Sequence, residues 1–422
     1  VCASGPGRIS MNPAIVPAEP AGATLMRTLF SIGFLARFSY ALARNPVLPL
    51  FAVALGAGPE GIGLAVGIST VTGILFKMPS GALSDVIGRR RTMLAGLVVF
   101  GLMPFAYLFI THYAALVVVR FLHGLATAIY GPVAMAVVAD IAGARKGEML
   151  SWFSSVGIAG TLLGAPIGGY LLFLLGGEEA GLTSYRAVFL CSALTGTAAL
   201  VLGLITLRNG DKPAEGRSLS ERAHLFFQGI REVVADRRVL MTSSMEGIQN
   251  MSMGALEAFL PVYAVTVAGL NVFHAGLIWG VQIVVTLIAK PVMGKVSDRW
   301  GRRPLIVAGM LLCAVPFALI PHLTGFVALM AAGMVFGLGE AFVTSSSAAL
   351  VADFCKARHY GAAMGTFGTI FDVGHAAGPI VTGLLVASFG YGPAFAIVAT
   401  LLCVSIPLFL RTVREEPQAE NL

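Results

Sequence analysis

Basic side chains recur at helical spacing inside otherwise apolar stretches in the first half of the chain. Arg37, Tyr40 and Arg44 are three and four residues apart, which places them on one face of a helix. Arg120 and His123 form a second face of this kind. A guanidinium group binds a carboxylate or a phosphate through two parallel hydrogen bonds, so these faces predict contact with an anion.

The second half of the chain carries acidic and amide side chains in the same kind of pattern. Glu246, Gln249, Asn250, Met253 and Glu257 lie on one helical face. The first half therefore contributes positive charge, and the second half contributes negative charge. This division predicts one binding space with a positive wall and a negative wall.

Three further side chains are suited to binding a proton. Glu340 and Asp372 have apolar neighbours, and apolar surroundings favour the protonated form of a carboxyl group. His375 follows Asp372 by one helical turn, and imidazole exchanges protons near neutral pH. We predict that these three groups couple the activity to protons. The alternative is that both acids are permanent partners of the arginines.

Composition places these side chains in a membrane protein. Of the 422 residues, 57% are hydrophobic and 12% are charged, and a soluble domain has about twice that charged fraction. Apolar runs long enough to cross a bilayer recur along the chain, which predicts an all-α membrane protein with lipid as its surroundings. The cysteines lack metal-binding spacing, and neither a nucleotide-binding loop nor a catalytic constellation occurs. We therefore expect no metal, no cofactor and no enzyme activity.

Twelve membrane spans are predicted, in two halves of six spans over 28–207 and 240–411. The spans cover 28–55, 61–82, 93–111, 114–141, 149–175, 186–207, 240–265, 272–294, 304–322, 325–353, 361–388 and 391–411. Residues 208–239 form a linker in which 219–238 has the pattern of an amphipathic surface helix. Polar tails cover 1–27 and 412–422.

The distribution of basic residues predicts the orientation of these spans. If both termini lie on one side, that side holds 21 of the 28 Lys and Arg residues, and the other side holds Arg186. Both termini are therefore expected in the cytoplasm, with the chain in a cell membrane such as the bacterial inner membrane. Because the net charge of +7 lies in short loops, it does not predict nucleic-acid binding. Twelve spans in one chain are enough for a monomer.

A charged phrase interrupts the apolar sequence twice, as 81-GALSDVIGRRR-91 and as 294-GKVSDRWGRR-303. In the first copy we expect Asp85 to face the start of the eleventh span, where the helix dipole stabilises a carboxylate. We expect Arg89 to reach Asp140 at the end of the fourth span. The alternative is that the arginines only hold the loop on the cytoplasmic side.

The second phrase belongs to a repeat with a shift of 213 residues. This shift aligns the two phrases and places Asp140 on Asp353. Asp298 and Arg302 are therefore expected to make the equivalent contacts, with the fifth span. Parallel repeats of this kind mark transporters with a site between their halves. Because Arg44 and Glu257 lie at similar depth by this repeat, we predict an ion pair that closes the outer side, with pairing inside each half as the alternative.

The first phrase resembles the loop signature of the major facilitator superfamily, and the second half carries a copy of it. Arg120 and Gly124 are similar to the family's Arg-x-x-x-Gly motif. The glycine stripe over 157–169 resembles the antiporter motif of the drug-exporter branch, although Ala165 interrupts the usual Gly-Pro pair. The resemblance extends from the first span to the twelfth.

This resemblance implies a secondary active transporter that works by alternating access and moves a small molecule. It implies a central cavity lined by spans one, four, seven and ten, and a charge cluster that locks the cytoplasmic side in the outward-facing state. The drug-exporter branch implies proton-coupled efflux of a small organic compound. Two alternatives remain open: uptake or exchange of an organic anion at the arginines, and a membrane sensor without transport.

The candidate site residues fall into three predicted roles: substrate binding, proton coupling and conformational gating. The substrate cavity is predicted to contain Arg37, Tyr40, Arg44, Arg120, His123, Glu246, Gln249, Asn250, Glu257, Gln282 and Glu340. Proton coupling is predicted for Glu340, Asp372 and His375. Conformational gating is predicted for Asp85, Arg89, Asp140, Asp298, Arg302 and Asp353.

Overall fold

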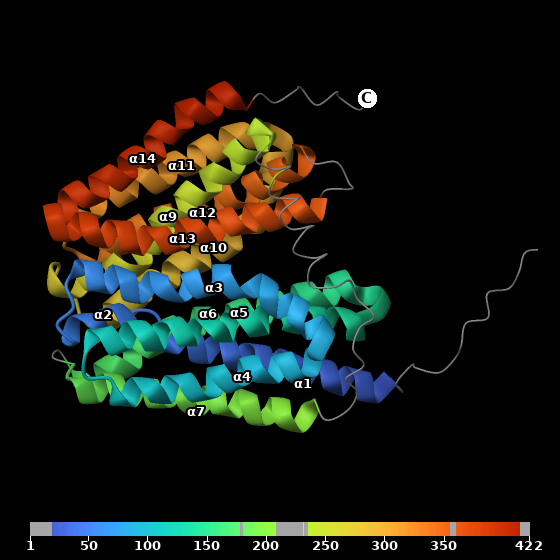
Figure 1. Cartoon of the computed structure of the whole chain (residues 1–422). Helices are drawn as coiled ribbons and strands as arrows, with labels where there is room; N and C mark the ends of the chain where they lie inside the picture. The colour runs from blue at the N-terminus through green and yellow to red at the C-terminus, as the bar shows by residue number, and fades with distance from the viewer. Residues whose placement is uncertain (1–18, 178–179, 208–230, 232–234, 355–359, 414–422) are drawn as a thin grey trace, which may run out of the picture.

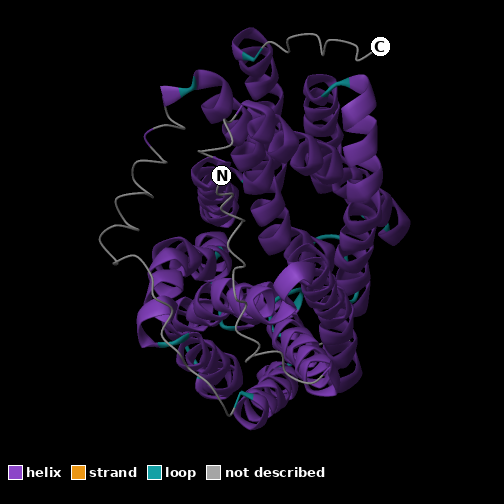
Figure 2. Ribbon diagram, turned by 90° about the vertical axis from the view of Figure 1, so that its right-hand side faces the viewer, coloured by secondary structure: helices purple, strands orange, loops and turns teal. Residues whose placement is uncertain are grey.

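The structure is a computed structural model that describes residues 19–177, 180–207, 231, 235–354 and 360–413. The secondary structure in these ranges is helical (Figure 2). The helices form two groups, one above the other in Figure 1, which we call the N half and the C half. Most of the predicted tails and of the predicted linker helix lies outside the described residues.

The two halves have similar helix orders. The N half contains α1 (Glu19–Leu42), α2 (Val47–Ala54), α3 (Pro59–Ile87), α4 (Arg89–Ala106), α5 (Tyr113–Ala142), α6 (Lys146–Gly176) and α7 (Leu182–Thr206). The C half contains α9 (Arg237–Thr266), α10 (Val272–Trp300), α11 (Arg302–Leu319), α12 (Phe326–Phe354), α13 (Tyr360–Phe389) and α14 (Tyr391–Thr412).

Ten of the helices in the described ranges are long and apolar enough to cross a membrane. Two further long helices, α1 and α9, carry polar faces instead. Most of α9 is buried against the protein, including Glu246 and Glu257, so its polar groups do not face lipid. The fold therefore confirms the prediction of an all-helical, multi-pass membrane protein.

The first predicted span, 28–55, contains two helices in the structure. Helix α1 ends at Leu42, and α2 begins at Val47. Pro46 has no N–H to donate, and the residue before a proline disfavours helical conformation. The position equivalent to Pro46 in the C half is Phe259, and α9 continues through it without a break.

Helix boundaries repeat at the predicted shift of 213 residues. The shift carries both ends of α3 onto those of α10, and both ends of α4 onto those of α11. Between these helices the chain turns at Gly88, with φ 102°, and at Gly301, with φ 90°. Because residues with a side chain rarely adopt positive φ, both copies of the charged phrase have glycine at this turn.

The two halves pack closely at the end of the bundle where α3 begins, which we call the far end. The contact is made by α3 with α13, side by side in Figure 1, and by α6 with α10. At Gly63 of α3, a Cβ atom would overlap the backbone of Pro379. At Gly280 of α10, a Cβ atom would lie 2.7 Å from Pro166 Cγ. Glycine thus lets the backbones of the two halves approach each other.

The halves separate toward the opposite end, which carries both charged phrases and which we call the basic end. Among the described residues, a Cβ atom at Gly294, Gly365 or Gly368 would meet no atom within 4 Å. The halves are therefore in close contact at the far end, and their helices lie farther apart toward the basic end (Figure 1).

Packing within the C half predicts a difference between two glycines of α13. A Cβ atom at Gly378 would overlap the backbone of Met251 and lie 3.0 Å from the nitrogen of Ala255, whereas Gly365 has open space. We expect Gly378→Ala to lower the free energy of unfolding by about 1–3 kcal/mol through overpacking. Thermal unfolding in detergent measures the effect, with Gly365→Ala as the matched control. Equal stability of both variants would contradict this account of the helix contact.

Candidate functional site

A cavity of about 780 Å³ lies between the two halves. Its wall is formed by α1, α3, α5 and α6 of the N half and by α9, α10, α12 and α13 of the C half. This volume matches sites that enclose drug-sized molecules. The residues with predicted roles that line it are Arg37, Tyr40, Arg44, Glu257, Glu340, Asp372 and His375.

Arg44 and Glu257 form an ion pair across the two halves. Arg44 lies in the break between α1 and α2, and its Nη2 donates to Glu257 Oε2 at 2.8 Å. His375 Nε2 lies 3.1 Å from the same carboxylate oxygen and 3.0 Å from Arg44 Nη2. The Glu257 side chain is 4% exposed, so solvent screens this pair little.

A second ion pair joins the halves through a lysine. Lys77 Nζ of α3 donates to Asp372 Oδ2 of α13 at 2.5 Å. Both side chains line the cavity, and the Asp372 side chain is 16% exposed. The partner of Asp372 is therefore a lysine of the N half and not one of the predicted arginines.

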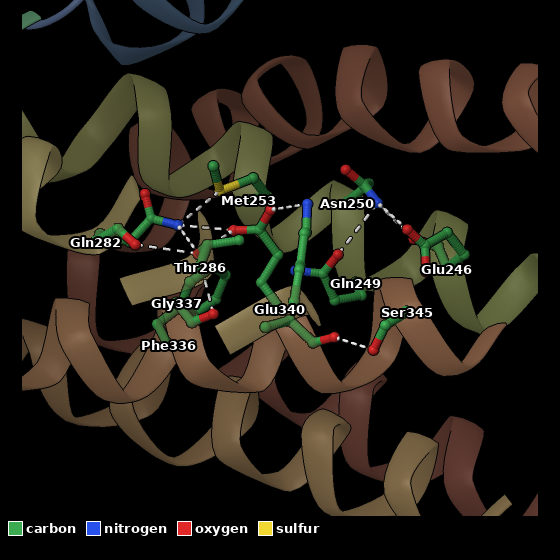
Figure 3. A network of polar contacts seen from close by, with 12 residues as sticks. Glu246, Gln249, Asn250, Met253, Gln282, Thr286, Phe336, Gly337, Glu340 and Ser345 are labelled. Carbon is green, nitrogen blue, oxygen red and sulfur yellow. Dashed lines mark hydrogen bonds and ion pairs between the residues drawn. The ribbon is translucent and has the colours of Figure 1, made fainter. Parts of the chain in front are cut away.

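Glu340 is held in a network inside the C half (Figure 3). Lys290 Nζ lies 3.4 Å from Glu340 Oε1, and Gln282 Nε2 donates to Glu340 Oε2 at 2.7 Å. Thr286 Oγ1 is 3.1 Å from the same oxygen. Gln282 is fully buried and holds Glu340 from behind. The sequence predicts that Gln282 lines the cavity, but the structure places it outside the lining.

Arg120 and His123 differ from the prediction in the same way, because both are fully buried within the N half. Arg120 Nη2 donates to Ser69 Oγ at 2.7 Å, and its guanidinium lies 5.6 Å from the centre of the Tyr40 ring. His123 Nδ1 lies 3.1 Å from the Tyr107 hydroxyl. Tyr40 lines the cavity, so these two side chains support its wall from behind.

The acidic and amide stripe of α9 is also buried, apart from Glu257 at the cavity. Glu246 and Gln249 are fully buried, and Asn250 is 3% exposed. Asn250 Nδ2 donates to Glu246 Oε1 at 3.2 Å and to Gln249 Oε1 at 3.1 Å (Figure 3). The periodicity identified the polar face correctly, but most of that face packs inside the C half and not along the cavity.

Equivalent ion pairs occur at the basic end of each half. Arg89 of α4 pairs with Asp140 of α5, and Arg302 Nε of α11 lies 2.6 Å from Asp353 Oδ2 of α12. Arg302 also lies 3.4 Å from Asp298. These contacts fall within each half. The Asp85 side chain lies outside the described residues.

Lys77 and Lys290 belong to the site but are not among the predicted residues. Two features of the sequence indicate them: both lie inside predicted spans, and they are 213 residues apart. The aromatic part of the cavity wall, which includes Tyr130, Trp279 and Phe371, is not predicted either. Aromatic residues are too common in membrane helices for their spacing to single these three out.

Comparison with known sequences gives a consistent result. The profile of the Major Facilitator Superfamily matches residues 29–287 and 269–422. An uncharacterised MFS-type transporter of Methanocaldococcus jannaschii is 23% identical over 397 residues, which are 93% of this chain and 97% of the relative. The multi-drug resistance efflux pump PmrA of Streptococcus pneumoniae is 23% identical over 378 residues, 87% of this chain and 90% of PmrA. The multidrug resistance protein MdtG of a Rahnella species is 26% identical over 377 residues, 85% of this chain and 86% of MdtG.

Solved structures share the fold. A crystal structure of the nucleoside transporter NupG superposes with a TM-score of 0.77 and 14% identity, over 93% of this chain and all of NupG. A bacterial homologue of the human lysosomal transporter Spinster, in an inward-facing and occupied conformation, gives a TM-score of 0.78 and 14% identity. That match covers 95% of this chain and all of the homologue.

The buried pair between the halves predicts energetic coupling between Arg44 and Glu257. Removing one partner leaves a poorly solvated charge on the other. The losses of unfolding free energy caused by Arg44→Gln and by Glu257→Gln should therefore add up to more than the loss caused by the double substitution. We expect a coupling of about 1–3 kcal/mol from a double-mutant cycle of thermal unfolding.

The matched control is the exposed pair of Arg145 and Glu148, whose nitrogen and oxygen atoms approach to 2.7 Å at the basic end. The same cycle at this pair should give no measurable coupling, because water screens both charges. Additive effects at Arg44 and Glu257 would show that their contact does not hold the halves together.

Proposed function

Because this chain belongs to the Major Facilitator Superfamily and is therefore a multi-pass secondary transporter, we propose that it exports a small organic compound in exchange for protons. In alternating access, the cavity between the halves opens to one side of the membrane at a time. The similarity to PmrA, a multi-drug resistance efflux pump, and to MdtG, a multidrug resistance protein, supports export. The observation that carries the proposal is the ion pair of Lys77 and Asp372, which joins the halves inside the cavity.

A proton on Asp372 would act directly on the contact between the halves. Protonation removes the negative charge that holds Lys77, so the link between α3 and α13 weakens. Water in the open cavity then solvates Lys77, and this pair no longer holds the halves in their present arrangement. Glu340 is proposed as a second proton site, because it contacts Lys290 at the cavity wall. His375 is proposed to take part through its contact with Glu257.

The orientation proposed for the chain follows from its basic end. Lys and Arg are concentrated in the loops of this end, which is therefore taken as cytoplasmic. A cavity that is open toward this end corresponds to an inward-facing transporter, and Arg44 with Glu257 closes the outer side. In the outward-facing state, Asp85 and the Arg89–Asp140 and Arg302–Asp353 pairs are proposed to hold the cytoplasmic side closed.

Uptake or exchange of an organic anion is a second candidate function. It is favoured by Arg37, which lines the cavity without an acidic partner among the described residues. Arg44 and Arg120 give it less support, because Arg44 is neutralised by Glu257 and Arg120 is buried behind the wall. The direction of proton movement distinguishes this function from export.

Proton flux in proteoliposomes tests the proposed function. A pH gradient is imposed, the internal pH is followed with a dye, and anionic, neutral and cationic aromatic compounds are added in turn. We expect at least one compound to dissipate the gradient in the direction of antiport. Asp372→Asn should reduce this flux to that of protein-free vesicles, and Glu340→Gln should reduce it in part, because neither amide can release a proton.

Glu148→Gln is the matched control, since this carboxylate is exposed and remote from the cavity. It should leave the flux unchanged. Full activity of Asp372→Asn would rule out Asp372 as the coupling group. Proton movement together with the compound, in the same direction, would favour uptake over export.

A further inference from the structure

We propose that Arg37 and Tyr130 bind an anionic group of the transported compound, such as a carboxylate, sulfonate or phosphate attached to an apolar body. The inference rests on the proposed function only in that the cavity between the halves receives the compound. It is independent of the direction of transport and of proton coupling. Three observations carry it: the charge balance of the cavity, the contacts of Arg37, and an unpaired hydroxyl beside it.

The charges that line the cavity do not balance. In the described ranges its lining contains four lysines and arginines, Arg37, Arg44, Lys77 and Lys290, and three carboxylates, Glu257, Glu340 and Asp372. Each carboxylate pairs with one lysine or arginine, and Glu257 also contacts His375. Among the lysines and arginines, one positive charge is left uncompensated. That charge is Arg37, because among the described residues no hydrogen bond or ion pair reaches its guanidinium.

The surroundings of Arg37 direct it into the cavity. Its stem lies against α6, where Gly160 and Gly157 leave room for it. A Cβ atom at Gly160 would lie 3.3 Å from Arg37 Cβ, and one at Gly157 would lie 3.5 Å from Arg37 Cγ. The side chain is exposed, and the cavity supplies this exposure. The guanidinium is thus anchored by its stem and free at its donor atoms.

Tyr130 provides a second donor at the same place. Its side chain is 2% exposed and lines the cavity, and its hydroxyl has no hydrogen-bond partner among the described residues. It lies close enough to Arg37 for the two groups to interact electrostatically. A buried hydroxyl without a partner is costly, so a ligand that accepts its hydrogen bond would be stabilised.

Alternating access explains why the uncompensated charge of Arg37 needs an anionic partner. While the cavity is open, water solvates Arg37. When the halves close around a bound molecule, that water is displaced, and an unpaired guanidinium becomes expensive at membrane depth. An anionic group on the ligand supplies the missing charge and accepts forked hydrogen bonds from the guanidinium.

The rest of the wall fits the apolar body of such a compound. Phe153, Ile158, Trp279, Ile283 and Phe371 line the same cavity. Apolar and aromatic walls with a few placed polar groups are typical of sites for drug-sized ligands. The ligand class is therefore an amphipathic organic anion rather than a lipophilic cation.

Binding of three matched compounds to the protein in nanodiscs tests the inference. Naphthalene sulfonate, naphthalene methanol and naphthylmethylammonium share one apolar body and carry negative, neutral and positive head groups. Titration calorimetry should show the tightest binding for the sulfonate. Arg37→Gln should weaken it by at least about tenfold, the change expected for loss of a charged hydrogen bond. Tyr130→Phe should weaken it by about threefold, because it removes one neutral donor.

Two control variants keep the result interpretable. Arg37→Lys retains the charge and should keep binding tighter than Arg37→Gln does. Arg145→Gln removes a positive charge at the basic end, outside the cavity, and should bind the sulfonate as the unmodified protein does. Subtracting the heat measured with protein-free nanodiscs removes the partition of each compound into lipid.

The inference is overturned if the sulfonate binds no tighter than the alcohol, or if both Arg37→Gln and Tyr130→Phe bind it normally. This measurement needs no gradient, so it separates the two proposals. Selective binding of the sulfonate without proton flux would refute proton-coupled export and leave the anion site standing. Proton flux driven by cations alone, with no sulfonate binding, would refute the anion site and leave proton-coupled export standing.

Discussion

The cost of an ionised side chain at membrane depth is the constraint on which this structure depends. An unpaired charge there costs about several kcal/mol or more, so charges inside the bundle need partners or water. Asp372 and Glu340 each meet a lysine, and Glu257 meets Arg44. Because the first and third of these pairs join the two halves, the requirement for pairing also determines how the halves hold together.

The internal repeat limits which residues can form these pairs. Arg44 and Glu257 are related by the shift of 213 residues, and two equivalent positions can touch only near the axis that relates the halves. Identical charges at such positions would repel, so the two copies carry opposite signs. Pairs inside one half have no such limit. Arg89 with Asp140 is therefore repeated unchanged as Arg302 with Asp353.

Sequence patterns predict the helices, the repeat and several charged contacts of this fold, because each depends on spacing along the chain. The polar face of α9 was identified by its period, and the position of Glu257 by the repeat. Spacing does not reveal which neighbour covers a face. Arg120 and Glu246 therefore appear equivalent to Arg37 in sequence, yet both are fully buried. Hydrophobicity likewise does not reveal the break between α1 and α2, which occurs at Pro46, a residue without a backbone N–H donor.

The closed far end combines two kinds of contact that respond differently to movement. Backbones approach at glycines such as Gly63 and Gly280, where small residues allow one helix to roll on another without removing a side chain. The ion pairs of Arg44 and Lys77 lie deeper, and they separate only if water or a proton replaces the partner. The glycines therefore allow the helices of the two halves to move against each other, whereas the halves separate only after the ion pairs are broken. Under the proposed function, a proton and the transported compound are the two agents that change the charge of the cavity and thereby the contact between the halves.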